Sequence, residues 1–365
     1  MSLKLAGALL CAAMSFAAAD AAAQTYRMVD VATLAQGNAT VVRGTNGAGV
    51  GVGGGHVVGS RSGAAGQRRG LLFESAGTQQ VTGLPGSDDT VVFALNDNGS
   101  LVGISNTAVA IRGFFGTRSG AMRELPPLGG DNGSAAYGLN NIGQAVGFST
   151  GTGGQRAVMW DASGAPRALP AVAGATSSRA GGINERGDIA GIISTATGPR
   201  PVLWPGGQTP TQLLLLAGHN VGEANAINAR GDVVGYSGVA SGLRRAALWP
   251  LNGAVVDLGT LPGGNFSEAF AINAFGDIVG TSTSNAGGRA VLWSRSGGIV
   301  DLNTQVAPSQ FVLSKAVGIN NSGTILATGY QLPAGHTAGT NDGHGHDETH
   351  ELPVKVFLLI RSGDQ

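Results

Sequence analysis

The sequence predicts an all-β protein: a seven-bladed β-propeller of four-stranded antiparallel blades, closed by pairing the N-terminal strand with the last blade. Three observations point to this fold. Glycine occupies 63 of 365 residues, against a usual share of about 7%. A motif of about 44 residues recurs along most of the chain. Each copy divides into short apolar stretches separated by turns rich in Gly and Asn, which is typical of antiparallel hairpins.

The overall composition excludes several other classes. Hydrophobic residues make up 42% of the chain, which argues against an intrinsically disordered protein. The glycine content argues against a helix bundle, because glycine inside a helix costs about 1 kcal/mol relative to alanine. Lys plus Arg and Asp plus Glu are equal at 22 each, so the net charge is zero. Nucleic-acid binding, which depends on a cationic excess, is therefore not expected.

Residues 1–23 have the organisation of a secretory signal peptide. Lys4 supplies the positive charge, residues 5–19 are apolar, and the following alanines offer cleavage after Ala23 or Ala19. The apolar part is shorter than the ~20 residues that cross a membrane, and no later stretch is long enough. We therefore expect a secreted or periplasmic protein without a membrane span. Cys11 lies in this segment, so the mature chain would contain no disulfide, zinc-thiolate site or cysteine nucleophile.

The repeat carries three markers. The first reads Asn-x-x-Gly, as in AINAFGDIVG (271–280), and its asparagines are Asn96, Asn140, Asn184, Asn228, Asn273 and Asn320. Counting back 44 residues from Asn96 leads to Val52, in a degenerate first copy, so that seven units fill one domain over residues 24–365. We interpret the marker as a turn. The second marker is a cation followed by apolar residues and Trp, and the third is a short strand ending in an acid and Leu.

The sixth unit shows the four expected strands in order: 267–273, 277–283, 289–295 and 299–302. Small residues stand two places before each marker asparagine and four places before the last five of them, such as Ala271 and Ala269 before Asn273. Period-two spacing would put them on one face of an innermost strand crowded around an axis. The last unit lacks its own acid-Leu strand, and residues 25–34 match it, which predicts the closure. A β-solenoid or a flat array is the alternative architecture.

The pattern DLGTLPGG (257–264), then S-x-A-x-A-I-N-x-x-G-x-[IV]-V-G, then RA-x-LW resembles the HAF-repeat family of secreted bacterial proteins. The resemblance extends from about residue 26 to residue 363. It implies an extracellular or cell-envelope protein with propeller-like repeats, and it supplies no catalytic residues. The His-Ala-Phe tripeptide itself is absent, and Glu268-Ala269-Phe270 fills one such place.

One cation stands at the second marker in every unit. The seven cations are Arg69, Arg112, Arg156, Arg200, Arg245, Arg289 and Lys355. In a propeller they would sit at equivalent radii and could present a positive ring to an anionic polymer. The alternative, which we favour, is that each pairs with carbonyl groups or with an acid of its own or a neighbouring blade. The candidate acids are Asp30, Glu124, Asp257 and Asp301. Likewise Trp160, Trp204, Trp249 and Trp293 could stack on sugars, but inter-blade core is favoured.

Two further groups could carry chemistry. The insertion at 331–353 holds His336, His344, His346 and His350 beside several acids, a set that suits zinc, copper or nickel. A solvated loop is the alternative there, and no other cofactor is expected. Asp88, Asp89 and Asp131 fall in inter-blade loops, where propeller enzymes place carboxylates.

The favoured function is a non-catalytic binding or surface-interaction module. We expect it to bind an extracellular glycan or protein and to act as a monomer. The first alternative is a carbohydrate-active enzyme that uses the loop carboxylates. The second is a metal-binding envelope protein that uses the histidine-rich insertion.

Overall fold

The computed structural model describes residues 26–34, 41–45, 51–55, 68–118, 120, 122–332 and 354–362, with backbone only at 34, 41–45 and 51–55. The predicted signal peptide and nearly all of the histidine-rich insertion lie outside these ranges. Among the described residues, no helix is long and apolar enough to cross a membrane.

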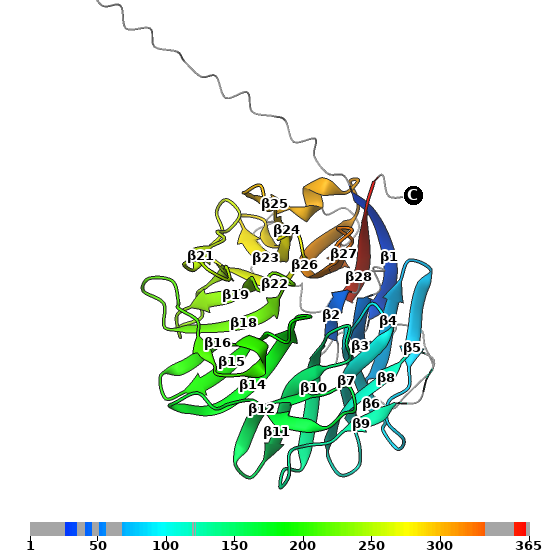
Figure 1. Ribbon diagram of the computed structural model, residues 1–365. Coiled ribbons are helices and arrows are strands. Elements are labelled where there is room, and N and C mark those ends of the chain that lie inside the picture. The colour runs from blue at the N-terminus through cyan, green and yellow to red at the C-terminus, as the bar shows by residue number, and fades with distance from the viewer. Residues whose placement is uncertain are drawn as a thin grey trace, which may run out of the picture.

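Within these ranges the strands form seven four-stranded antiparallel sheets (Figure 1). We number the first six sheets in the order of the chain and give the strands of each from the innermost to the outermost. The first three sheets are β2 (Val41–Thr45), β3 (Gly51–Gly55), β4 (Arg69–Glu74), β5 (Gly77–Val81); β6 (Asp89–Leu95), β7 (Ser100–Asn106), β8 (Ile111–Thr117), β9 (Arg123–Leu125); and β10 (Gly133–Leu139), β11 (Ala145–Gly151), β12 (Gly154–Trp160), β13 (Pro166–Ala168). The next three are β14 (Ala175–Ile183), β15 (Ile189–Thr195), β16 (Gly198–Trp204), β17 (Thr211–Gln212); β18 (Val221–Ile227), β19 (Val233–Gly238), β20 (Arg244–Trp249), β21 (Val256–Asp257); and β22 (Ser267–Ile272), β23 (Ile278–Ser284), β24 (Gly287–Trp293), β25 (Ile299–Asp301).

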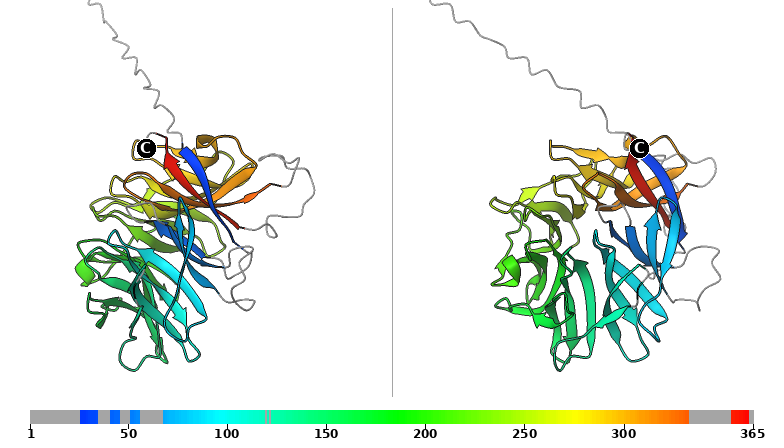
Figure 2. Two further views of the ribbon diagram at one scale, coloured as in Figure 1. Left: turned by 90° about the vertical axis from the view of Figure 1, so that its right-hand side faces the viewer. Right: turned by 45° about the vertical axis from the view of Figure 1, so that its right-hand side comes forward.

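The seventh sheet takes its strands from both ends of the chain. Its order is β1 (Tyr26–Leu34), β28 (Val354–Arg361), β27 (Ile325–Gln331) and β26 (Phe311–Ile319). β1 runs antiparallel to β28, with Tyr26 opposite Arg361 and Leu34 opposite Val354. Figure 2 shows the two strands, blue and red, side by side.

The sheets are arranged as the blades of a propeller. The innermost strands β2, β6, β10, β14, β18, β22 and β26 contact one another in succession, and β26 contacts β2. The fold is therefore an all-β propeller of four-stranded antiparallel blades. Short 3₁₀ turns follow β16 (Pro205–Gly207) and β25 (Leu302–Gln305).

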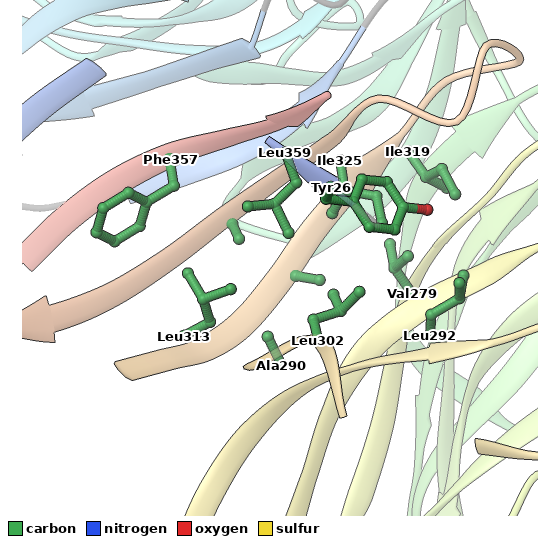
Figure 3. Packing of buried hydrophobic residues seen from close by; sticks show 12 residues of the cluster. Tyr26, Val279, Ala290, Leu292, Leu302, Leu313, Ile319, Ile325, Phe357 and Leu359 are labelled. Atoms are coloured by element: carbon green, nitrogen blue, oxygen red, sulfur yellow. The ribbon is translucent and has the colours of Figure 1, made fainter. Parts of the chain in front are cut away.

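The core lies between neighbouring blades. In the cluster of Figure 3, Tyr26, Phe357 and Leu359 of the seventh sheet pack with Val279 and Leu292 of the sixth. These side chains are at most 5% exposed, and full burial of each stabilises the fold by about 1.5–3 kcal/mol.

The four tryptophans belong to this inter-blade core. Their exposed fractions are between 0% and 4%. The indole Nε1 of Trp160 donates to the carbonyl of Pro126 at 2.7 Å, and that of Trp204 to Pro170 at 2.9 Å. All four indoles are buried, and those of Trp160, Trp204 and Trp249 are hydrogen-bonded to the loop that enters their blade, whereas the buried Nε1 of Trp293 makes no such bond. The interpretation as core rather than sugar-stacking platform is therefore confirmed.

One sequence expectation about the innermost strands is wrong. In every sheet the register between the first and second strands shifts by one residue, as between Ala224 and Ala226. This bulge breaks the period-two alternation, so the two small residues do not share one uninterrupted face. Ala224 is fully buried between blades, whereas Ala226 is half-buried.

The first unit is also offset from its predicted position. Val52 lies inside β3, opposite Arg43 and Leu72, and not at a marker turn. Thr45 pairs with Gly51 as Leu95 pairs with Leu101 in the second sheet. The residue after Thr45 in the sequence is Asn46, which therefore corresponds to Asn96. The predicted position is wrong because Asn46 and Asn96 are 50 positions apart in the sequence, six more than the usual 44.

Candidate functional site

The marker asparagines form a hydrogen-bonded chain around the central axis. Each side-chain Oδ1 accepts the amide N–H four residues later, as Asn228 does from Asp232 at 2.9 Å. In the first five of these asparagines, Nδ2 donates to the main-chain carbonyl of the marker asparagine in the next blade. These inter-blade bonds join Asn96 to Asn140, Asn140 to Asn184, Asn184 to Asn228, Asn228 to Asn273 and Asn273 to Asn320, at 3.1–3.2 Å.

The predicted turn is confirmed, and the asparagine does more than close it. The glycine three residues later, such as Gly231 with a φ of 92°, occupies the left-handed region. Asn228 is only 4% exposed, and its side-chain Nδ2 additionally links two blades. Aspartate could make the turn but could not donate this bond, because a carboxylate only accepts.

An aspartate four residues after the asparagine ties the turn to the outer part of the blade. Asp188 accepts from Nδ2 of Asn184 at 3.0 Å and from the amide of Gly206 at 3.0 Å. Burial would raise the pKa of Asp188, but the hydrogen bonds from Asn184, Arg186 and Gly206 outweigh it and lower that pKa. Asp232 joins Asn228 to the amide of Leu251 in the same way.

The asparagine chain encloses a cavity of about 250 Å³ at this end of the axis. We call its deeper lining the floor: these are the aliphatic residues before each asparagine, Leu95, Leu139, Ile183, Ile227, Ile272 and Ile319. We call the residues after each asparagine the rim: Asp97, Asn141, Glu185, Ala229, Ala274 and Asn321. The accessible lining is more polar than apolar, with amide and carboxylate groups converging around a smaller aliphatic floor.

The rim is polar on one side and small on the other. Asn141 donates from Nδ2 to Asp97 at 3.0 Å, and its main-chain N–H donates to Glu185 at 2.9 Å. Both carboxylates therefore flank one asparagine. Ala229 and Ala274, in the fifth and sixth blades, leave the other side of the rim without polar side chains.

The predicted cations are largely held by partners within the fold. All four acids proposed as partners make the expected ion pairs: Lys355 with Asp30, Arg112 with Glu124, Arg245 with Asp257 and Arg289 with Asp301. Arg156 pairs instead with Asp131 of the loop that enters its blade, at 2.9 Å. Arg200 donates to carbonyls, among them that of Asn220. Arg69 begins β4 and is half-buried.

We expect replacement of two of these cations to separate stability from binding. Arg289→Gln should lower the free energy of unfolding by about 1–3 kcal/mol, since Arg289 is 5% exposed and its loss leaves Asp301 without its cation. Arg245→Gln should cost at most about 1 kcal/mol, because that pair is exposed. Urea denaturation measures both values. Retention on a heparin column should not change, and a clear loss of retention at unchanged stability would favour the positive ring.

The three candidate loop carboxylates are not brought together as a pair of free acids. Asp89 at the start of β6 is bonded to Nε of Arg68 at 2.8 Å, and Asp131 accepts from Ser149 at 2.6 Å and pairs with Arg156. Burial would raise the pKa of both, but these partners outweigh it and the pKa of each is lowered. Asp88 is exposed in the loop before β6. A general acid needs a raised pKa, so Asp89 and Asp131 are poorly suited to that role.

The lowered carboxylate pKa values predict an acid-labile fold. Asp89, Asp131 and Asp188 bind a proton less readily in the folded chain than in the unfolded chain, whose ordinary value is 3.8. Their stabilisation is present above that value and is lost as the pH falls through the lowered folded values. Urea denaturation between pH 6 and pH 3 should show a falling free energy of unfolding. Asp131→Asn should make the fall shallower, and an unchanged slope would contradict the assignment.

The histidines of the insertion, His336, His344, His346 and His350, lie outside the described residues, so metal binding there stays a prediction. Of the remaining histidines, His219 is described, and its Nδ1 lies 2.9 Å from the hydroxyl of Ser237.

A charged cluster that the repeat pattern did not predict lies on the innermost strands and on the two strands that follow β18 in the fifth blade. Arg179 of β14 pairs with Glu223 of β18 and lies 5.2 Å from the ring centre of Tyr137. Arg244 pairs with Glu268 at 2.9 Å and lies 4.1 Å from the ring centre of Tyr236. Each guanidinium thus has a carboxylate partner, and the cluster joins the third to sixth blades. The charged residues five positions before Asn184, Asn228 and Asn273 were its sequence signal.

Comparisons with known proteins support the fold. No family model and no curated protein sequence matches the chain. Among solved structures, puromycin hydrolase is similar with a TM-score of 0.55 and 15% identity over 83% of this chain. This match covers 54% of the hydrolase, so the present chain spans about half of that protein's length.

Two further structures match over nearly their whole length. An oligogalacturonate lyase in complex with manganese gives a TM-score of 0.52 at 10% identity, covering 93% of this chain and 99% of the lyase. Virginiamycin B lyase from Staphylococcus aureus gives 0.49 at 13% identity, covering 92% and 100%. At 15% and 10% identity, the likeness to puromycin hydrolase and to the oligogalacturonate lyase shows the fold alone.

Proposed function

We propose that the protein is a non-catalytic binding module that takes its ligand, a glycan or a protein, in the cavity at the asparagine end of the axis. The cavity is the observation that carries this proposal. It has a volume of about 250 Å³, an aliphatic floor, and a rim with carboxylates and amides on one side. The rim residues differ from blade to blade although each occupies the same turn, so they are available for recognition.

The alternative of a carbohydrate-active enzyme has less support from the geometry. Glycoside hydrolysis uses two carboxyl groups on either side of the scissile bond, one of them protonated. Asp89 and Asp131 are each bound to an arginine and have lowered pKa values. The proposal of a binding module uses these carboxylates only as structural partners of the cations.

We further propose that the seven sheets act as one closed ring with β1 as the closing strand, and that the chain is a secreted or periplasmic member of the HAF-repeat family. The repeat pattern and the basic, apolar and alanine-rich order of residues 1–23 support the latter. The pairing of β1 with β28 supports the former.

Filling the opening tests the binding proposal. Ala274→Trp places a large side chain at the small side of the rim and should abolish retention of any ligand found on glycan or peptide arrays. Because Ala274 follows the asparagine in a turn at the surface, the melting temperature of the variant protein should change little. Ala240→Trp, in a hairpin loop of the fifth blade away from the cavity, is the control. Retention unaffected by Ala274→Trp would exclude the cavity as the site.

A further inference from the structure

The marker turns contain both constant and variable positions. The aliphatic residue before the asparagine, the asparagine itself and the glycine after it are the same in type in the second to seventh units. The asparagine and glycine hold the turn and the ring. The two positions directly after the asparagine vary widely, from Asp97 and Asn98 in one blade to Ala274 and Phe275 in another. Some of these side chains bond to a neighbouring blade, as Asn98 does to the carbonyl of Asn141 and Asn321 does to the amide of Ala274. Because the turn itself is the same in each blade, the variation also places different groups around the cavity, where they are available for ligand recognition.

The charge at the rim is one-sided. Asp97 and Glu185 flank Asn141, and the other three members of the rim are two alanines and one asparagine. No Lys or Arg belongs to the rim. Arg186 and Arg230, one residue farther along their turns, pair with Asp188 and Asp232. A ligand group lying at this side of the rim would therefore be favoured if it carried positive charge and several hydrogen-bond donors.

The floor determines which part of a ligand it can contact. Its six leucine and isoleucine side chains offer no hydrogen-bonding group, and the cavity of about 250 Å³ has room for an aliphatic side chain and the group that carries it. Two residues after Asn140 and Asn273, in the same turns as the rim, Ile142 is 59% exposed and Phe275 is 57% exposed, which are large values for apolar side chains. They offer apolar contact to whatever continues outward from the cavity.

We propose that the cavity binds the amino-terminal residue of a polypeptide when that residue is aliphatic. Its ammonium group lies beside Asp97 and Glu185, its side chain packs on the floor, and the next residues pass over Phe275 or Ile142. This inference rests on the proposed binding function and names the ligand class for the same cavity. Capture of an amino terminus needs hydrogen-bond acceptors for three N–H groups, and the four carboxylate oxygens of Asp97 and Glu185 can provide them beside their bonds to Asn141.

Titration calorimetry with short peptides tests the assignment. The probe is a hexapeptide with a free amino-terminal leucine and an amidated carboxyl end. We expect N-acetylation of this peptide, or replacement of its leucine by aspartate, to weaken binding at least tenfold. The double variant Asp97→Asn, Glu185→Gln should weaken binding of the free peptide to the same degree. Asp257→Asn, on the outer strand β21, should leave it unchanged.

The outcomes separate this inference from the proposed function. Equal binding of the free and acetylated peptides, or no binding of either, would overturn the amino-terminal assignment. Leucine amide binding as tightly as the hexapeptide would make a small amine the ligand instead. If peptides do not bind but an arrayed glycan is retained and is lost on Ala274→Trp, the binding function stands and this ligand class is wrong. Melting temperatures recorded for every variant identify any that fail to fold.

Discussion

Replacing Asn228 by alanine should lower the free energy of unfolding by about 2–4 kcal/mol. The side chain accepts from the amides of Arg230 and Asp232 and donates to the carbonyl of Asn273. Since Asn228 is buried, its removal leaves these main-chain groups without a partner at the centre of the ring. Urea denaturation at neutral pH measures the loss.

Two further variants make this test specific. Asn228→Asp keeps Oδ1 as an acceptor but loses the donor and sets a carboxylate against Asp232, so it should destabilise the fold as much as alanine. Asn98→Ala removes an exposed amide with one bond to Asn141 and should cost less than about 1 kcal/mol. If Asn228→Asp were as stable as the natural chain, the inter-blade bond would have no energetic role.

Deleting residues 26–34 should remove most of the stability of the fold. The strand buries Tyr26, Val31 and Ala32, supplies the partner of β28 and carries Asp30, which pairs with Lys355. Burial of the two larger side chains alone contributes about 3–6 kcal/mol, which is comparable with the whole net stability of a typical domain. Thermal unfolding followed by circular dichroism should show a large fall in melting temperature and a broader transition.

A peptide of residues 25–35 added in trans should restore part of the lost melting temperature, because it can pair with the exposed edge of β28. Two point variants serve as a matched pair. Val31→Asp places a charge at a buried position and should resemble the deletion, while Arg27→Asp at an exposed position should not. An unchanged melting temperature after the deletion would remove β1 from any role in closing the ring.

Much of the fold could be predicted because the repeat pattern in the sequence indicates it directly. A period near 44 residues with four short strands leads to a blade, and a cation at a fixed place with an acid on the next strand leads to an ion pair such as Arg245 with Asp257. The tryptophans were predictable as core because apolar residues flank them in the strand.

Other features depend on spatial relations that a linear pattern does not contain. The bulge in each innermost strand leaves no sequence signal beyond a residue that varies, from Tyr137 to Asn225. The donor bond from each marker asparagine reaches a residue 44 to 47 positions away, so the turn interpretation alone could not reveal it. The cavity exists only where six such turns converge, and its rim residues looked like ordinary turn residues until the ring placed them together.

Methyl-resolved NMR gives the most direct test of ligand binding at the asparagine end of the axis. The floor is made of Leu95, Leu139, Ile183, Ile227, Ile272 and Ile319, whose methyl groups report on the cavity. Titration with the leucine-initiated hexapeptide should shift these signals, with those of Ile299 and Val221 on outer or opposite parts of the blades unchanged. Shifts confined to residues outside the floor, with the six floor signals unmoved, would contradict the account.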